Sequence, residues 1–267
     1  MASVNLIRAL EENLWDFWKV FGRTDKGTLA ETPEQLWFET ELDVLPYNGV
    51  LRFRETEDID AKIDAHFEHF KKIGKPFYWF IHPTMEPKDL EIRLPARGFE
   101  SVDSLTGMTA QLDQLPDLGP LAAGVEIREV VDDTEVDSLI DFLMWRWEVP
   151  SEHKSFYEEI MRRNKFGQPD QLDRVWCAWK DGAPVAKAVT HETDGVIGLY
   201  GVATRPEARG LGLGRAICLQ ALQETDAGRG LLGVLHSSPM AVGLYEKMGF
   251  ETICDFKVFA TAGSFHV

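Results

Sequence analysis

Apolar positions in the first half of the chain follow helical and strand spacings in turn. Leucines and aromatic residues recur every three or four positions from Leu6 to Phe21, so we expect a first helix that closes at Gly22. The run Pro-Phe-Tyr-Trp-Phe-Ile at 76–81 is apolar throughout and predicts a buried central strand. The rest of this half predicts a loop at 23–34, strands at 35–40 and 49–54, a helix from Ile59 to about Gly74, a helix at 89–97 disturbed by Pro95, and strands at 99–104 and 107–112.

The second half has a denser pattern of strands. Asp181 and Gly182 separate two β-rich runs and form the strongest hairpin signal in the chain. A helix capped near Asp132 carries its apolar stripe to Met144. The other predicted elements are a strand at 125–130, a helix at 151–164, strands at 175–180 and 184–191, a strand at 199–204 followed by glycines and a helix, a strand at 231–235, a helix at 238–248 and a strand at 251–260.

A segment rich in proline and glycine separates the two halves. Residues 113–124 contain two prolines and two glycines and are the best candidate for a linker. A chain of 267 residues is long enough for one large or two medium domains. We therefore predict a first domain at 1–115, a linker at 116–124 and a second domain at 125–267.

The stretch after the 199–204 strand has the composition of an anion-binding loop. It reads Arg-Gly-Leu-Gly-Leu-Gly-Arg from Arg209 to Arg215 and leads into a helical apolar pattern. Backbone N–H groups at a helix start point toward one spot, where the helix dipole also favours negative charge. Gly210, Gly212 and Gly214 lack a Cβ, so a phosphate could approach the backbone closely.

The loop alone leaves several interpretations open. The dinucleotide fingerprint requires G-x-G-x-x-G, whereas this loop is G-x-G-x-G. The P-loop requires a Gly-Lys-Ser/Thr ending, which is missing here. A tight strand-to-helix turn without a ligand is the remaining alternative.

A second motif downstream gives the loop a context. Residues 238–250 read Ser-Pro-Met-Ala-Val-Gly-Leu-Tyr-Glu-Lys-Met-Gly-Phe. Together with Arg209–Gly214 after a strand, this segment resembles the GCN5-related N-acetyltransferase (GNAT) family, with its acyl-CoA pyrophosphate loop and its A-x-x-L-Y-x-x-x-G-F segment. The resemblance covers roughly residues 125–260. It implies an α/β (α+β) fold in which a mixed, mostly antiparallel central sheet is flanked by helices.

The first half resembles a second, degenerate copy of the same domain. Residues 47–52 resemble 199–204, and residues 94–100 resemble 245–251, at nearly the same offset. After Arg54 the chain reads Glu-Thr-Glu-Asp-Ile-Asp, with acid where a pyrophosphate would lie. We predict tandem GNAT-like domains in which the first binds no acyl-CoA and walls off part of the substrate cleft. A false repeat made by short Gly-Phe coincidences is the alternative.

The family resemblance also implies a reaction and a set of site residues. The reaction would be direct attack by an amine of a small molecule or peptide on acetyl-CoA, or another acyl-CoA, in a ternary complex without a metal. Tyr245 would contact the co-substrate and protonate its leaving thiolate, since a phenol of pKa about 10 holds its proton at neutral pH. Other implied contacts are Val202, Ala203 and Thr204 to the pantetheine, Arg209, Gly210, Leu211, Gly212, Leu213, Gly214 and Arg215 to the pyrophosphate, and Ser238.

The residue that deprotonates the amine is not identified by the sequence. His191, Glu192 and Glu148 are candidates, a water relay is equally possible, and we choose none of them. Two other classes of function compete with catalysis. A non-catalytic acyl-CoA sensor would keep the cofactor site without turnover, and a scaffold protein would keep only the fold.

The net charge and the cysteine content limit which partners and which cellular compartment we expect. The net charge of −16 disfavours nucleic acid and anionic membranes as partners. Three separated cysteines without a C-x-x-C motif indicate core thiols in a reducing cytoplasm, and no signal-peptide core precedes them. We expect a cytoplasmic monomer or homodimer.

His66 and His69 lie three positions apart, which we interpret as a solvated helix face rather than a metal site.

Overall fold

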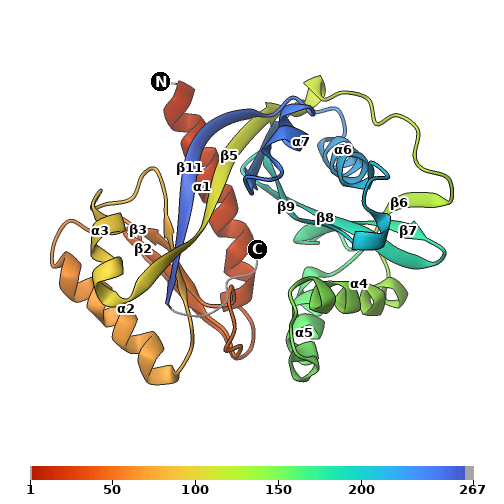
Figure 1. The fold of residues 1–267 in the computed structure, drawn as a ribbon. Coiled ribbons are helices and arrows are strands. Elements are labelled where there is room, and N and C mark those ends of the chain that lie inside the picture. The colour runs from red at the N-terminus through yellow and green to blue at the C-terminus, as the bar shows by residue number, and fades with distance from the viewer. Residues whose placement is uncertain (1, 262–267) are drawn as a thin grey trace. The chain divides into compact units, whose positions relative to one another are not determined.

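The computed structural model describes residues 2–261. They fold into two compact units, each with a mixed, mostly antiparallel sheet flanked by helices (Figure 1). The predicted fold class, two tandem α/β (α+β) domains of this kind, is therefore confirmed.

Each unit is assembled from two separate segments of the chain. Within the described residues, the N-terminal unit comprises 15–106 and 254–261, and the C-terminal unit comprises 2–14 and 107–253. Helix α1 (Ala2–Gly22) and strands β5 (Phe99–Gln111) and β11 (Glu251–Thr261) contribute residues to both units. The predicted boundaries, 1–115 and 125–267, follow the chain continuously and stay a prediction of domains. The compact units differ from them because strand pairing, not chain order, decides which unit a segment joins.

In the N-terminal unit the strand order is β1-β2-β3-β4-β11. Strands β3 and β4 run parallel, whereas the other neighbours are antiparallel. Trp79, Phe53 and Phe70 lie in its buried core. The elements are β1 (Thr28–Glu31), β2 (Gln35–Glu39), β3 (Gly49–Phe53), α2 (Ile59–Ile73), β4 (Tyr78–Ile81), α3 (Leu90–Arg93) and the 3₁₀ turn η1 (Pro95–Arg97).

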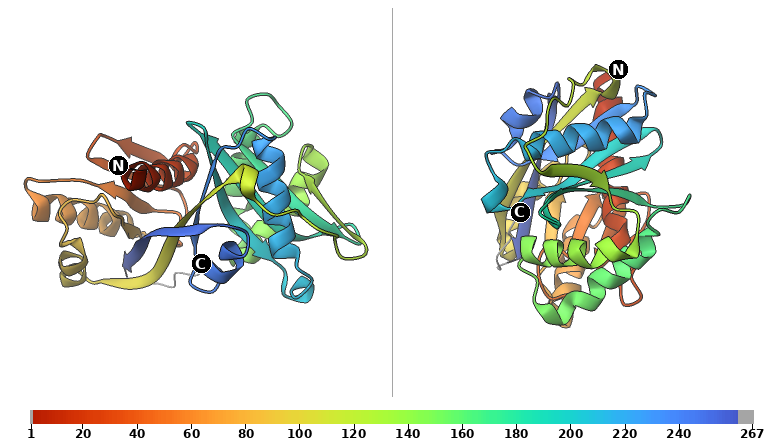
Figure 2. Two further views of the ribbon diagram at one scale, coloured as in Figure 1. Left: turned by 90° about the horizontal axis from the view of Figure 1, so that it is seen from above. Right: turned by 90° about the vertical axis from the view of Figure 1, so that its right-hand side faces the viewer.

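In the C-terminal unit the strand order is β5-β10-β9-β8-β7-β6, and β9 and β10 run parallel. Its elements are the 3₁₀ turn η2 (Leu112–Gln114), β6 (Val125–Glu129), α4 (Asp133–Arg146), the 3₁₀ turn η3 (Ser151–His153), α5 (Lys154–Asn164), β7 (Asp173–Lys180), β8 (Ala183–Thr193), β9 (Val196–Thr204), the 3₁₀ turn η4 (Pro206–Ala208), α6 (Leu213–Asp226), β10 (Leu232–Ser237) and α7 (Val242–Glu246). Helix α6 covers one face of this sheet, and α4 and α5 lie on the other (Figures 1 and 2). The unit therefore has three layers.

The internal repeat is visible in the topology. A strand, a helix and a parallel strand follow one another as β3-α2-β4 and again as β9-α6-β10. Each set is followed by a short helix, a glycine in the left-handed region and a long strand. Those glycines are Gly98 and Gly249, with φ of 86° and 94°. Because the two halves share the same order and the same parallel pair, they are two copies of one architecture.

Three elements differ from the sequence prediction. Residues 99–111 form the single strand β5 rather than two, because Gly107 is not among the glycines with positive φ and the chain passes straight through it. Strand β1 lies inside the predicted loop 23–34, because all four of its residues pair with β2. Helix α7 is shorter than the predicted 238–248, because Pro239 disfavours helical backbone at Ser238 and a turn precedes the helix.

The interpretation of His66 as a solvated residue is also wrong. His66 is 7% exposed, donates a hydrogen bond from Nε2 to Gln35 Oε1 at 2.8 Å, and lies edge-on to Trp79. Burial lowers the pKa of His66 to about 4, so the imidazole is neutral in the folded protein. The helix face that bears His66 therefore belongs to the core.

Candidate functional site

The parallel pair β9 and β10 separates at its C-terminal end. The ladder between them runs from Val196↔Leu232 to Leu199↔Leu235, and within the described residues it goes no further. On its other edge β9 stays paired with β8 as far as Thr204, after a register shift beside Gly201. Gly201 has a φ of 53°, which fits a bulge at this point. Val202, Ala203 and Thr204, three predicted contacts, therefore lie on the stretch where β9 has left β10.

The glycine loop turns the chain from β9 into α6 with two left-handed residues. Gly210 has a φ of 77° and Gly212, the N-cap of α6, a φ of 74°. No atom lies within 4 Å of where a Cβ would stand on either glycine, so the space outside the loop is open. The first hydrogen bond of the helix joins Ala216 N to Gly212 O. The N–H groups before it have no helical partner and form the positive end of α6.

Gly214 connects the loop to the other predicted segments. A Cβ on Gly214 would lie 3.8 Å from Thr204 Oγ1 and 3.9 Å from Leu244 Cδ2. The end of β9 and helix α7 therefore both lie close to the start of α6. Ser238, after β10, is half-buried, and its carbonyl accepts a hydrogen bond from Ala241 N at 3.0 Å.

The two loop arginines have different surroundings. Arg209 is exposed, and its Nε donates to Thr204 O at 3.4 Å. The Arg215 guanidinium donates to the carbonyls of Leu118 and Asp117 at 3.4 and 3.5 Å. Arg209 thus lies beside the open stretch of β9, while Arg215 holds the segment that leads into the second half. Leu211 is exposed, whereas the Leu213 side chain is buried in the core, so only its backbone can face a ligand.

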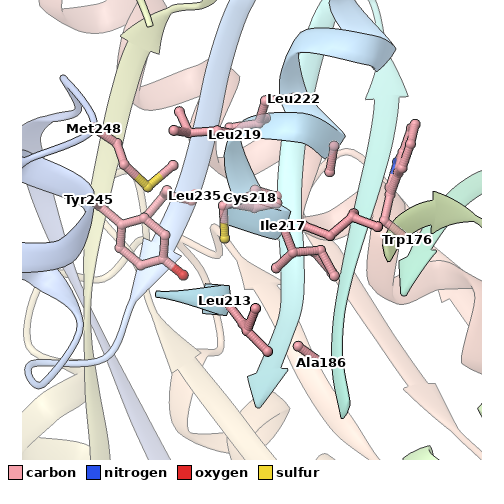
Figure 3. Packing of buried hydrophobic residues seen from close by; sticks show 14 of the residues in the cluster. Trp176, Ala186, Leu213, Ile217, Cys218, Leu219, Leu222, Leu235, Tyr245 and Met248 are labelled. Carbon is pink, nitrogen blue, oxygen red and sulfur yellow. The ribbon is translucent and has the colours of Figure 1, made fainter. Parts of the chain in front are cut away.

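Tyr245 projects from α7 into the core under α6. The residue is 7% exposed, and Figure 3 shows its ring beside Cys218 with the hydroxyl directed away from Met248. Burial, with the nearby Cys218 thiol, raises the pKa of Tyr245 above its ordinary value. Burial also raises the pKa of Cys218 to about 12. Both groups therefore keep their protons at neutral pH, and the phenol can act as a donor.

The three sequence candidates for a base lie in different environments. Glu192 forms a two-pronged ion pair with Arg229, with both N–O distances at 2.8 Å. His191 Nδ1 lies 2.7 Å from Asp173 Oδ1 and is largely buried. Glu148 is exposed just after α4, with a φ of 51°. Glu192 and His191 are engaged with other side chains, so neither side chain is free to act without giving up a partner.

Sequence reasoning missed Lys187, in the middle of β8. Lys187 is 4% exposed, and a Cβ on Gly201 would lie 2.7 Å from its Nζ. Burial lowers the pKa of Lys187 to about 8. The signal was present, because this lysine stands between alanines in an apolar strand, where a charged residue is unusual.

Replacement of Lys187 by Met is expected to stabilise the protein. A lysine with a lowered pKa binds fewer protons in the folded than in the unfolded chain between about pH 8 and pH 10.5, so its destabilisation is complete below pH 8 and vanishes above pH 10.5. We expect a gain in the free energy of unfolding of about 1–3 kcal/mol at pH 7. Denaturant unfolding at pH 7 and pH 10 measures it. An equal difference between the two proteins at both pH values would contradict this assignment.

The N-terminal unit closes the position that corresponds to the open stretch of β9. Glu86 N donates to Phe53 O at 3.1 Å, and Glu55 N donates to Glu86 O at 3.0 Å. The side chain of Glu55 forms an ion pair with Lys62 in the first turns of α2. Backbone pairing and a carboxylate therefore occupy the place where the C-terminal unit has an open edge and glycines.

Two comparisons of the sequence with known proteins found matches in the second half of the chain or over part of it. Residues 136–250 match the Acetyltransferase (GNAT) family. Among curated proteins, a probable translation initiation factor IF-2 of Thermococcus sibiricus is 30% identical over 111 residues, 42% of this chain. That match spans only 17% of the length of the initiation factor.

Solved structures share the fold over nearly the whole chain. A GCN5-related N-acetyltransferase from Kribbella flavida has a TM-score of 0.69 and 17% identity, with 96% of each chain covered. A tandem GNAT protein from the clavulanic acid biosynthesis pathway has a TM-score of 0.62 and 13% identity, covering 95% of this chain and 96% of its own. A GCN5-related N-acetyltransferase from Sphaerobacter thermophilus has a TM-score of 0.61 and 14% identity, covering 85% and 80%.

Residues 2–261 contain no group of three His, Cys, Asp or Glu side chains arranged as metal ligands would be. No helix in the same range is long and apolar enough to span a membrane. No disulfide joins Cys177, Cys218 or Cys254.

Proposed function

We propose that this chain moves an acetyl or related acyl group from acyl-CoA to an amine. The premise is that it belongs to the acetyltransferase (GNAT) family through residues 136–250. The amine would belong to a small molecule or a peptide and would attack the thioester directly while both substrates are bound. The single observation that carries the proposal is the end of the β9–β10 ladder beside a glycine loop that opens a helix.

The residues at this place fit acyl-CoA. Beyond Leu199 one edge of β9 is taken by β8, and the edge toward β10 carries no ladder within the described chain. A strand-like pantetheine can add main-chain hydrogen bonds to Val202 and Thr204 there. The N–H groups from Gly210 to Arg215, with open space outside the loop, suit a pyrophosphate. When bound, the co-substrate supplies the acyl group as a thioester.

Tyr245 is proposed as the residue that holds a proton for the leaving thiolate. Its raised pKa keeps the phenol protonated at neutral pH. No described residue forms a hydrogen bond with its hydroxyl, so the O–H is available to a ligand. Proton donation of this kind contributes about 10²- to 10⁴-fold to rate. Arg209 would add positive charge near the phosphates, and Ser238 would contact the co-substrate at the end of β10.

Acetyl-CoA titrated into the full chain is expected to bind once per chain, because Glu86 and Glu55 close the corresponding place in the N-terminal unit. Isothermal titration calorimetry measures the stoichiometry.

Addition of an amine panel (a polyamine, an amino sugar, an amino acid and a peptide) should then raise the release of free CoA thiol above the rate without amine.

Each alternative gives a different result in these two assays. Binding without amine-stimulated thiol release would favour the non-catalytic sensor. Absence of binding would overturn the proposed function and favour the scaffold. Two binding events per chain would show that the N-terminal unit is not degenerate.

A further inference from the structure

Lys187 is a buried cation without a counter-ion in the described chain. Its side chain is 4% exposed, and no described residue forms a hydrogen bond or an ion pair with its Nζ. Ionisable groups act on it from two elements: Cys177 and Asp173 of β7, and Arg146 of α4. Cys177 keeps its proton because burial raises its pKa to about 12, and Asp173 is bonded to His191. Asp173 still favours the charged form of Lys187, but no described carboxylate forms an ion pair with its Nζ.

The position of Lys187 relates it to the proposed acyl-CoA site. In the ladder it stands opposite Ala203 of β9, next to the register shift. A Cβ on Gly201 would lie only 2.7 Å from its Nζ, closer than a real Cβ contact allows, so the amine occupies space that only a glycine leaves open. Gly201 and Val202 are where β9 has left β10, so the amine lies at the stretch along which the thioester would be held. Gly201 has no side chain, so the space beside the Lys187 amine is not filled from β9.

We propose that Lys187 is itself an acyl acceptor, so that the protein acylates its own β8 strand from an acyl-CoA bound at β9. The proposal rests on the proposed function, because the donor must occupy that site. It adds a covalent modification site to the chain.

The step balances with the two reactants alone. The neutral amine of Lys187 attacks the acyl carbon, an N–C bond forms and the C–S bond breaks. The amine nitrogen loses one proton and the sulfur takes up one, so CoA leaves as the free thiol with no net gain or loss of protons. If Tyr245 gives its proton to the sulfur, the proton from the amine restores the phenol. The product is a neutral amide, which removes an unpaired charge from the interior and is favoured for that reason. An ordinary lysine with a pKa of 10.4 is almost fully protonated at pH 8, whereas Lys187 is near half neutral.

The acyl-lysine would also affect turnover. It places an amide next to Gly201, on the stretch that the thioester of the next donor must reach. Acylation of Lys187 is therefore expected to slow the transfer to an external amine. A protein incubated with acetyl-CoA alone should lose activity in parallel with its modification.

Mass spectrometry of the full chain tests the proposal. The protein is incubated with acetyl-CoA at pH 8, digested, and the acetylated fraction of each lysine is followed in time. Lys187 is expected to be acetylated at least tenfold faster than Lys180, at the end of β7. Lys187→Arg keeps the charge and should lose the modification, and Gly212→Val, which disturbs donor binding, should lose it too. Acetyl phosphate, which does not use the site, should modify exposed lysines without this preference.

The outcomes separate this proposal from the proposed function. If calorimetry shows acetyl-CoA binding and Lys187 is not acetylated, or is acetylated no faster than Lys180, self-acylation is overturned and the proposed function stands. If acetyl-CoA does not bind, both fail. Acetylation of Lys187 that persists at the same rate in Gly212→Val would also overturn the proposal, because the donor would then not come from the site.

Discussion

Replacement of Tyr245 by Phe is expected to lower the rate of acyl transfer by about 10²-fold or more while acyl-CoA binding changes by less than about twofold. Phe keeps the ring that packs beside Cys218 and Phe250 and deletes only the hydroxyl. The loss should therefore appear in kcat, because the proton for the thiolate is needed in the transition state and not for binding. Steady-state thiol release and calorimetry measure the two quantities.

A matched control separates catalysis from stability. Tyr47→Phe deletes a hydroxyl from a tyrosine that is also buried, at 2% exposure, in the N-terminal unit. It should leave kcat unchanged. If Tyr245→Phe kept full turnover with intact acyl-CoA binding, Tyr245 would not be the acid, and a water or another group would have to protonate the thiolate.

Replacement of Gly212 by Val is expected to weaken acyl-CoA binding by about 10- to 100-fold. Gly212 combines a φ of 74° with open space at its Cβ position, in front of the helix start. A valine there disturbs the N–H groups of the loop and fills the space proposed for the pyrophosphate. One lost hydrogen bond to a charged group is worth about 1.5–3 kcal/mol, which corresponds to this range. Calorimetric titration with acetyl-CoA measures the change.

Gly228 supplies the control for backbone strain. It follows α6, has a φ of 77°, and also has no atom within 4 Å of its Cβ position. Gly228→Val therefore imposes a similar conformational penalty, and both variants should lose about 1–2 kcal/mol of the free energy of unfolding. Only Gly212→Val should lose acyl-CoA affinity. Equal affinities in the two variants would mean that the loop does not hold the pyrophosphate.

Most of the secondary structure was predictable because it depends on local pattern. Helix α2 follows from apolar spacing between Ile59 and Phe70, and the β7–β8 hairpin follows from Asp181-Gly182, both of which have positive φ. The errors occurred where distant pairing decided the outcome. Strand β1 exists because β2 pairs with it, and Gly107 stays extended within β5. The local sequence alone determines neither the formation of β1 nor the extended backbone at Gly107.

The candidate site shows the same division. Gly210 and Gly212 identified the loop because only glycine adopts their left-handed backbone without strain. Lys187 was missed, because its significance depends on its contact with Gly201, in another strand. Asn13 was missed as well: it donates to Val196 O at 3.0 Å and accepts from the Tyr200 hydroxyl at 2.7 Å, although 183 or more positions separate it from either. Those hydrogen bonds connect the middle of α1 to β9.

By itself, the sequence determined the order of the elements, the tandem repeat, the glycine loop before α6 and the motif that carries Tyr245. These are properties of short segments, set by backbone preference and by apolar spacing. Only the tertiary structure decided where the β9–β10 ladder ends, that Glu86 closes the equivalent place between β3 and β4, and that an uncompensated lysine lies beside the opening. The physical reason is that each depends on hydrogen bonds or packing between residues far apart in the chain, which local pattern does not encode.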